Sequence, residues 1–375
     1  MREFKDKIFD ITLGILLILT PIIFVPFNIG RLNGWVAKYQ WSLWKFFNVS
    51  NVESVQTLFF CLAVLILFLV SMISRQLRPF KDLPMTVFFG LILANVLIHP
   101  LGVKVIPYIL FGFLLYYLVV EYIKDVRVIA YPLLIVSTLN TIFAVLQLIG
   151  IHYPYSDTMR CDGVMFLSSH MALYQAISIP MVYMISPWLI IIPIIGLLLS
   201  GSIVPLIAAL IGMTFLLRRS NFLSMPMTGI YGAIALYLIF IFNGLIYKFM
   251  IRLSVWVSSL DFSFFGHTLG SFKSVLPAIG ESPTTYSAYL TIYYYLGVAG
   301  YCTLIYYVID KVIRFRKSKA GKPFECLFAS IITLGFCGLT QSFLDFPRLI
   351  FTAIVIMAGL SAFLMKGATN GLSEN

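Results

Sequence analysis

The residues best suited to chemistry lie in polar stretches between long apolar runs. They are three arginines and one histidine: Arg160, Arg252, Arg348 and His267. A guanidinium group is planar and matches the oxygens of a phosphate with two parallel hydrogen bonds. Histidine side chains can accept or donate a proton near neutral pH, so His267 is a candidate general base or hydrogen-bond donor. One interpretation is that the arginines bind a lipid diphosphate, with His267 as a candidate base.

Each of these residues also has a structural explanation. Arg252 and Trp256 are four residues apart, which suits an amphipathic helix at a membrane surface. Arg160 lies between two aspartates and could form exposed ion pairs of little energetic value. Asp345 and Pro347 suit the start of a helix. Both interpretations are open from the residues alone.

The composition predicts a polytopic membrane protein. Of the 375 residues, 60% are hydrophobic and only 11% are charged, and the mean hydropathy is +0.97. These values exclude a soluble enzyme and a nucleic-acid-binding protein. The formal net charge of +11 comes from basic residues clustered at the ends of apolar runs, which is the pattern of cytoplasmic loops in membrane proteins.

The apolar runs predict an all-α transmembrane bundle that forms a single membrane domain over residues 1–375. We expect about 12 spans, with a range of roughly 10–12. A large extracytoplasmic loop, residues 248–284, lies between the ninth and tenth spans. The spans are placed near residues 10–29, 54–74, 84–99, 103–123, 127–150, 168–186, 188–200, 202–217, 228–247, 285–311, 324–344 and 347–366. Three of them are short: the third, the seventh and the eighth.

Most lysines and arginines then fall on the side of the N-terminus, which predicts that both termini are cytoplasmic. Six of them lie in the stretch 311–322, which we interpret as a cytoplasmic loop. The four histidines fall on the other side of the membrane. Nucleotide-activated substrates are absent there, so an activated substrate would have to arrive on a lipid. Almost no ionisable residue is predicted in the middle of a span.

Three stretches resemble the O-antigen ligase and Wzy-type O-antigen polymerase superfamily of bacterial membrane glycosyltransferases. Residues 160–166, followed by 171–173 and Pro180, are similar to the Arg-x-x-Gly-x-Phe entry to a central span in that family. Residues 197–202 are similar to its small-residue turn. Arg252 with Trp256, then 266–272, 287–290 and 297–300, resembles its large periplasmic loop and the following helix. The resemblance covers roughly residues 130–365.

The resemblance implies transfer of a glycan from an undecaprenyl-diphosphate-linked donor in the bacterial inner membrane, without metal or cofactor. Arg160, Arg252 and Arg348 would bind the diphosphate leaving group, and a loop residue would activate the acceptor hydroxyl. Partners would be the lipid-linked oligosaccharide, membrane lipid, and a flippase and a chain-length regulator. No nucleic acid is expected.

Two departures from the family pattern bear on the catalytic residue. Tyr286 stands where the family often has a histidine, and a phenol with an ordinary pKa of about 10 is a poor base at neutral pH. The family's arginine after the small-residue turn is also missing, because the chain reads Ile203-Val204 there. We therefore expect a polymerase-like or divergent member, with His267 and Tyr286 as candidate catalytic residues.

Three alternatives remain at this point. An O-antigen ligase would join the glycan to lipid A core. A transporter or flippase would use the outer Arg and His residues as a gate, but transporters usually carry charges within the membrane and internal repeats. A catalytically inactive relative would act as a scaffold, and Tyr286 is the best argument for it.

Overall fold

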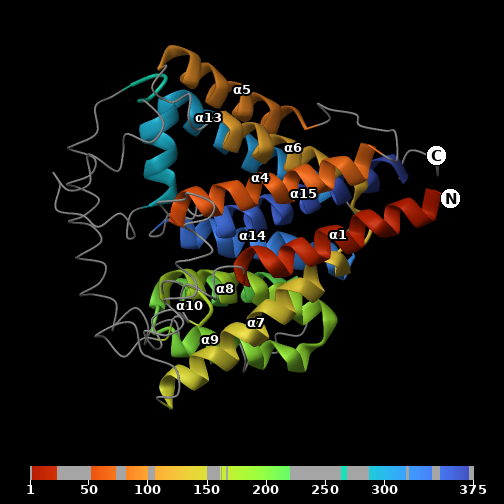
Figure 1. Ribbon diagram of the computed structural model, residues 1–375, viewed down its shortest axis with the longest axis vertical. Helices are drawn as coiled ribbons and strands as arrows, with labels where there is room; N and C mark the ends of the chain where they lie inside the picture. Colours follow the sequence, from red (N-terminus) through yellow and green to blue (C-terminus); the bar gives the residue numbers. More distant parts are fainter. Residues whose placement is uncertain are drawn as a thin grey trace, which may run out of the picture.

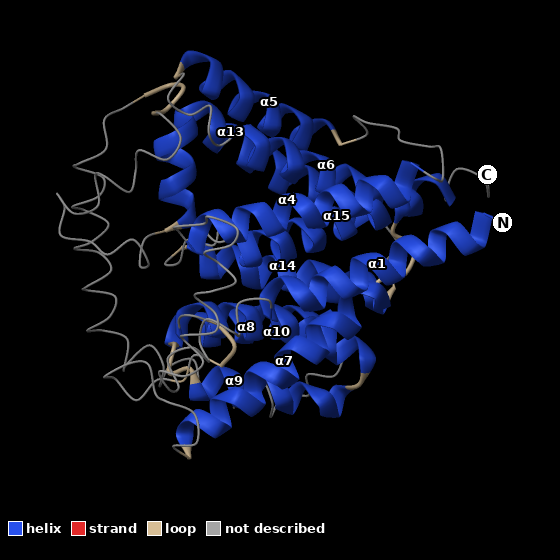
Figure 2. Cartoon of the chain, viewed as in Figure 1, coloured by secondary structure: helices blue, strands red, loops and turns tan. Residues whose placement is uncertain are grey.

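The computed structural model describes residues 2–22, 52–72, 82–99, 106–149, 161, 163–165, 168–219, 263–267, 287–317, 321–339 and 347–370. These residues are helical apart from short turns and connecting segments, with no strand among them (Figure 2). The predicted all-α class is therefore confirmed. The predicted ninth span, 228–247, lies outside the described residues.

The other predicted apolar runs coincide with helices. In chain order these are α1 (Arg2–Ile22), α4 (Val52–Met72), α5 (Leu83–Ile98), α6 (Ile106–Tyr122), α7 (Arg127–Leu148), α8 (Ser168–Ile185), the short 3₁₀ helix η2 (Pro187–Ile190) with α9 (Ile191–Leu199), α10 (Ile203–Arg219), α13 (Ala288–Lys317), α14 (Lys322–Gly338) and α15 (Pro347–Asn370).

The helices form two packing groups joined by a shared middle (Figure 1). In one group α8 packs against α7, α9, α10 and α14. In the other, α6 packs against α4 and α15, and α5 packs against α13. Helix α1 packs against α7 and α4, and α14 packs against α15, so these contacts connect the groups. The N- and C-termini lie at the same end of the bundle (Figure 1).

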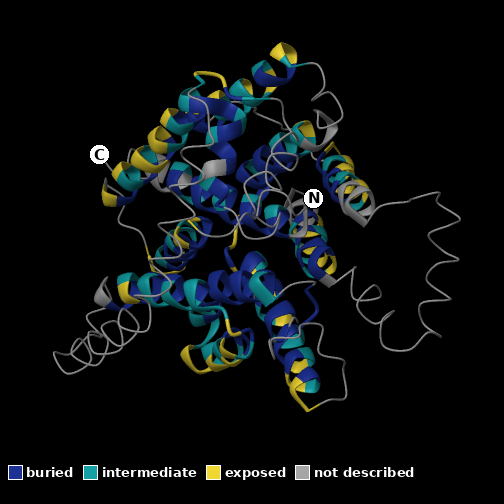
Figure 3. Ribbon diagram, turned by 90° about the vertical axis from the view of Figure 1, so that its left-hand side faces the viewer, coloured by how far each residue is buried: buried dark blue, intermediate teal, exposed yellow. Residues whose placement is uncertain are grey.

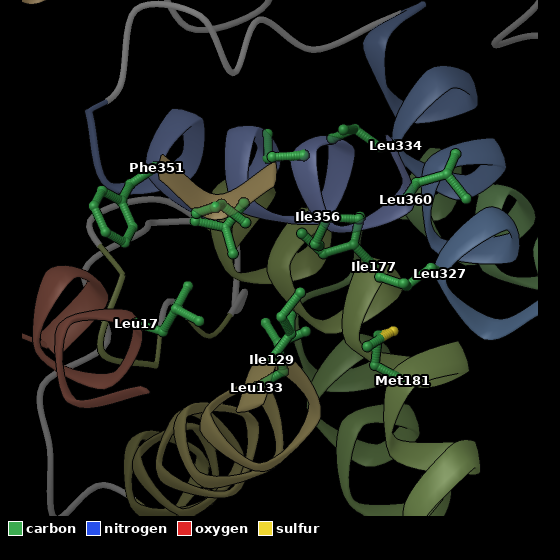
Figure 4. Close-up of a cluster of buried hydrophobic side chains, with 14 of the residues drawn as sticks. Leu17, Ile129, Leu133, Ile177, Met181, Leu327, Leu334, Phe351, Ile356 and Leu360 are labelled. Carbon is green, nitrogen blue, oxygen red and sulfur yellow. The ribbon is translucent and has the colours of Figure 1, made fainter. Parts of the chain in front are cut away.

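The core lies where the two groups meet. Leu17 of α1, Ile129 of α7, Ile177 of α8, Leu327 of α14 and Ile356 of α15 converge there (Figure 4). All five are almost completely inaccessible to solvent. Close packing of such aliphatic side chains stabilises the helix bundle through many small van der Waals contacts.

Exposed residues lie along the outer faces of the helices (Figure 3), and many of them are apolar. On α13 the exposed residues include Ile305, Tyr306, Val308, Ile309 and Ile313. The exposed face of α4 carries leucines and isoleucines in the same way, and Trp188 is 87% exposed. Helices that are apolar on both the buried and the exposed face are typical of a chain in contact with lipid.

Among the described residues, two helices are long and apolar enough to cross a membrane: Arg127–Leu148, and Thr291–Arg316 within α13. The remaining apolar helices are shorter, such as Leu83–Ile98 and Pro187–Leu199. The prediction of about 12 spans is therefore not confirmed as a number of spans, although its helix positions are reproduced. The loop predicted at 311–322 is wrong for residues 311–317, because these residues are helical and α13 continues to Lys317.

Close packing of α9 on α7 and α8 depends on Gly196. A Cβ at this position would lie 2.4 Å from Nε2 of Gln175 and 2.6 Å from Oγ1 of Thr141. Both groups are already engaged, because Gln175 donates to Thr141 Oγ1 and Thr141 donates to the carbonyl of Ile192. Neither can move away without losing a buried hydrogen bond.

We predict that Gly196→Ala lowers the stability of the purified protein in detergent by about 1–3 kcal/mol, because it overpacks this contact. Gly90→Ala on α5 is the matched control, since a Cβ there meets nothing within 4 Å. Both variants gain about 1 kcal/mol of helix propensity, so the difference in their thermal unfolding isolates the clash. Equal stability of the two variants would contradict the packing of α9.

Candidate functional site: a broken helix filled by a loop segment

Helix α13 is broken at Gly297. The backbone there has φ 60° and ψ −154°, which is outside the helical region and is essentially restricted to glycine. The break divides the helix into an N-terminal half, 288–296, and a C-terminal half, 298–317. The sequence prediction contained Gly297 but treated it as part of one continuous span.

Residues 263–267, here called the inserted segment, supply the hydrogen bonds that the break removes. The N–H of His267 donates to the carbonyl of Tyr294 at 2.8 Å. In the other direction, the N–H groups of Val298 and Ala299 donate to the carbonyls of Ser263 and Phe264, both at 3.2 Å. Both new helix ends therefore have backbone partners, as an apolar surrounding requires.

Two glycines permit this close approach. A Cβ on Gly266, which has φ 75°, would lie 2.4 Å from the carbonyl oxygen of Tyr295. A Cβ on Gly297 would lie 2.3 Å from the carbonyl oxygen of Ser263. The side chain of Ser263 closes the turn, because its hydroxyl accepts from the N–H of Gly266 at 2.9 Å. No other residue type could occupy either glycine position without displacing backbone.

Asn95, in the last turn of α5, holds the inserted segment and the broken helix together. Its Nδ2 donates to three carbonyl oxygens: Tyr295 at 2.7 Å, Phe265 at 3.0 Å and His267 at 3.1 Å. The side chain is only 2% exposed. A single amide thus links three separate stretches of the chain, which the sequence analysis did not identify.

The imidazole of His267 is fixed by stacking as well as by its backbone. Its ring lies 4.5 Å from the ring of Tyr294, with an angle of 29° between the two planes. The residue is half-buried. Of the predicted catalytic residues, His267 is therefore the one held in a defined position. Tyr286 lies outside the described residues.

A second segment folds against the other packing group. The N–H of Gly163 donates to Oε1 of Gln147 at 3.1 Å, and the N–H of Val164 donates to Oδ1 of Asn140 at 3.0 Å. The N–H of Cys161 donates to the carbonyl of Leu199 at 3.2 Å. The structure thus brings together parts of two stretches singled out in the sequence: Cys161, from the first stretch, contacts Leu199 in the turn 197–202.

The predicted diphosphate-binding arginines are only partly within the described structure. Arg160 and Arg252 lie outside the described residues. Arg348 falls in the first turn of α15, which begins at Pro347 as the sequence predicted. The described residues contain no cluster of His, Cys, Asp or Glu that could hold a metal ion.

The structure adds a buried ion pair that the sequence analysis missed. Nζ of Lys311 on α13 lies 2.6 Å from Oδ2 of Asp82, and these side chains are 3% and 0% exposed. The hydroxyl of Tyr116 donates to the same carboxylate oxygen at 2.5 Å and lies 2.7 Å from the hydroxyl of Ser361 on α15. This polar cluster connects α5, α6, α13 and α15.

Two features of the sequence hid this cluster. Asp82 precedes a helix with Pro84 in its first turn, so it looks like an ordinary N-cap. In the structure its side chain makes no capping hydrogen bond and turns instead to Lys311. Lys311 was counted with the basic residues of a loop, whereas it lies inside α13, with its Nζ 4.9 Å from the ring centre of Tyr307. The helical spacing of Tyr307 and Lys311 was the available signal.

Comparison of the sequence with models of known protein families and with curated proteins finds no match. The resemblance to O-antigen ligases and polymerases therefore stays a prediction from three short stretches of sequence.

We predict that Lys311→Met destabilises the protein by about 3–5 kcal/mol, because it leaves the Asp82 carboxylate buried without its cation. The double variant Asp82→Leu with Lys311→Met should recover most of this loss, since an apolar pair carries no desolvation penalty. Thermal unfolding of the four members of this double-mutant cycle measures the coupling.

Arg314→Met is the control for this cycle. Arg314 pairs with Asp310 at 2.8 Å, but its side chain is 39% exposed. Its loss should cost at most about 1 kcal/mol. A cost for Lys311→Met as small as that for Arg314→Met would show that the pair is hydrated and not buried.

Proposed function

We propose that this chain is an integral membrane glycosyltransferase that acts on a glycan carried by undecaprenyl diphosphate at the extracytoplasmic face of the bacterial inner membrane. The reaction would most simply polymerise repeat units of O-antigen or a similar surface polysaccharide. The observation that carries the proposal is the fixed position of His267, the candidate base, at the broken helix α13. Catalysis requires such preorganisation of the reacting groups.

The membrane location is supported by the apolar exterior and by the two helices long enough to span a bilayer. The termini lie at one end of the bundle (Figure 1). In the proposed orientation this end faces the cytoplasm, because most basic residues lie on that side. The C-terminal end of α5, which carries Asn95, and the inserted segment lie at the opposite end (Figure 1).

The proposed chemistry needs no metal. His267, or Tyr286 in its place, would take the proton of the acceptor hydroxyl as that oxygen attacks the anomeric carbon. Negative charge develops on the departing diphosphate, and Arg160, Arg252 and Arg348 would stabilise it more strongly in the transition state than in the ground state. A ligase would share this chemistry and differ in its acceptor, lipid A core.

We expect His267→Gln to reduce glycan chain extension by about 10²–10⁴-fold, the usual contribution of a general base. Arg160→Ala and Arg252→Ala should each abolish it through loss of charge stabilisation. The measurement is polymer formation from a lipid-linked oligosaccharide in proteoliposomes containing each purified variant, with protein level and thermal unfolding checked in parallel.

His99→Gln is the matched control, because His99 follows the last residue of α5 at the same end of the bundle and makes no contact with the inserted segment among its described hydrogen bonds. It should retain wild-type output. Wild-type polymer length from His267→Gln would remove this residue as the base, and full activity of both arginine variants would remove the diphosphate site.

A second candidate function is transport of a lipid-linked or free polysaccharide. Two observations favour it: the discontinuous helix α13 and the buried pair between Asp82 and Lys311. Transporters use broken helices and buried charges at their substrate and ion sites. Movement of the labelled lipid between leaflets without polymer formation, in the same proteoliposomes, would favour transport.

A further inference from the structure

Several carbonyl oxygens at the break in α13 share one side-chain donor group. Three carbonyl oxygens, those of Phe265, His267 and Tyr295, lie within 3.1 Å of one atom, Nδ2 of Asn95. An amide nitrogen carries two hydrogens, so it cannot satisfy three acceptors fully. Oδ1 of Asn95 is also buried and has no hydrogen-bond partner. The site therefore lacks positive charge at a point where several oxygens meet.

The ends of both halves of α13 lie at this point. The carbonyl end of residues 288–296 carries a partial negative charge, and the first N–H groups of the following half, those of Val298 and Ala299, are engaged by the carbonyls of Ser263 and Phe264. Two glycines allow the inserted segment to pack closely against α13. Gly266 and Gly297 each lie nearer to a neighbouring peptide than a residue with a Cβ could. Close backbone packing thus supports the convergence of the three carbonyls, together with the hydrogen bonds from Asn95.

We propose that the break in α13 is a binding site for a monovalent cation, coordinated by the carbonyl oxygens of Phe265, His267 and Tyr295 together with Oδ1 of Asn95. Carbonyl oxygens at an unwound stretch of helix coordinate Na⁺ in membrane proteins by replacing its hydration shell. The proposal concerns this site alone and does not rest on the proposed glycosyltransferase activity.

The side chain of Asn95 suits both states of such a site. With Nδ2 toward the carbonyls, the amide donates to them and holds the break together. Rotation by 180° about the bond between Cβ and Cγ exchanges Nδ2 and Oδ1, which places a fourth oxygen beside the three carbonyls. A cation can then be bound by oxygen atoms alone, and the currently unpartnered Oδ1 gains a partner.

The ligands favour a monovalent ion over a divalent one. All four proposed ligands are neutral oxygens, whereas Ca²⁺ and Mg²⁺ sites normally include carboxylates. No carboxylate contacts Asn95 among its hydrogen bonds in the described residues. The titratable groups facing the site from the described elements are His267 and Tyr294, whose rings stack on each other.

The test is the thermal unfolding of the full-length protein in detergent as Na⁺ or K⁺ replaces N-methylglucamine at constant chloride concentration. Binding to the folded state alone raises Tm with ion concentration. We expect a saturable rise of about 3 °C or more with Na⁺ or with K⁺ in the wild type. The proposal would be overturned if neither Na⁺ nor K⁺ raised Tm. It would also be overturned if N-methylglucamine chloride, added at the same concentrations, raised Tm equally.

Two variants of Asn95 separate cation binding from simple hydrogen bonding. Asn95→Asp removes the N–H donors and keeps the oxygens, so its Tm should be low in N-methylglucamine and should rise more steeply with Na⁺ or K⁺ than in the wild type. Asn95→Leu removes all polar atoms and should lose the ion-dependent increment.

Thr303→Val is the control, because Thr303 also lies on α13 and its hydroxyl donates only to the carbonyl of Ala299 among its described hydrogen bonds. It should keep the wild-type ion dependence. If Asn95→Asp is destabilised by the same amount in every salt, Asn95 acts only as a hydrogen-bond donor and the cation site is excluded.

Discussion

The candidate site depends on one constraint: backbone N–H and C=O groups in an apolar surrounding must find partners within the protein. The break at Gly297 frees such groups on both halves of α13. The inserted segment and Asn95 engage four of them, the carbonyls of Tyr294 and Tyr295 and the N–H groups of Val298 and Ala299. Without these partners an irregular stretch in the middle of an apolar helix would be too costly to maintain.

This constraint explains why His267 has a defined position although it belongs to a long polar stretch. Its N–H replaces a lost helical hydrogen bond, so the residue is held at the level of Tyr294. Stacking against the ring of Tyr294 then limits the orientation of the imidazole. A base must be held in such a way to act on a particular proton, and a histidine in a freely solvated loop would not be.

The sequence predicted the fold class and the helix positions because both follow from the length and placement of apolar runs. It also singled out the glycines near 266 and 297 and the turn near 200. It did not predict that Gly266 docks into the break at Gly297, since pairing between distant loops leaves no local periodicity. Asn95 and the pair between Asp82 and Lys311 were missed for a related reason. A polar residue near a helix end normally faces water, and only the packing of α5 against α13 shows that these side chains are buried.

The two missed features lie on the same pair of helices. Asp82 binds Lys311 at the start of α5, and Asn95 binds Tyr295 near its end. Thirteen residues of helix separate Asp82 from Asn95, which corresponds to about 20 Å. Buried polar contacts therefore join α5 and α13 at both ends of α5. Sliding one helix along the other is costly, because it would leave these buried groups unpaired.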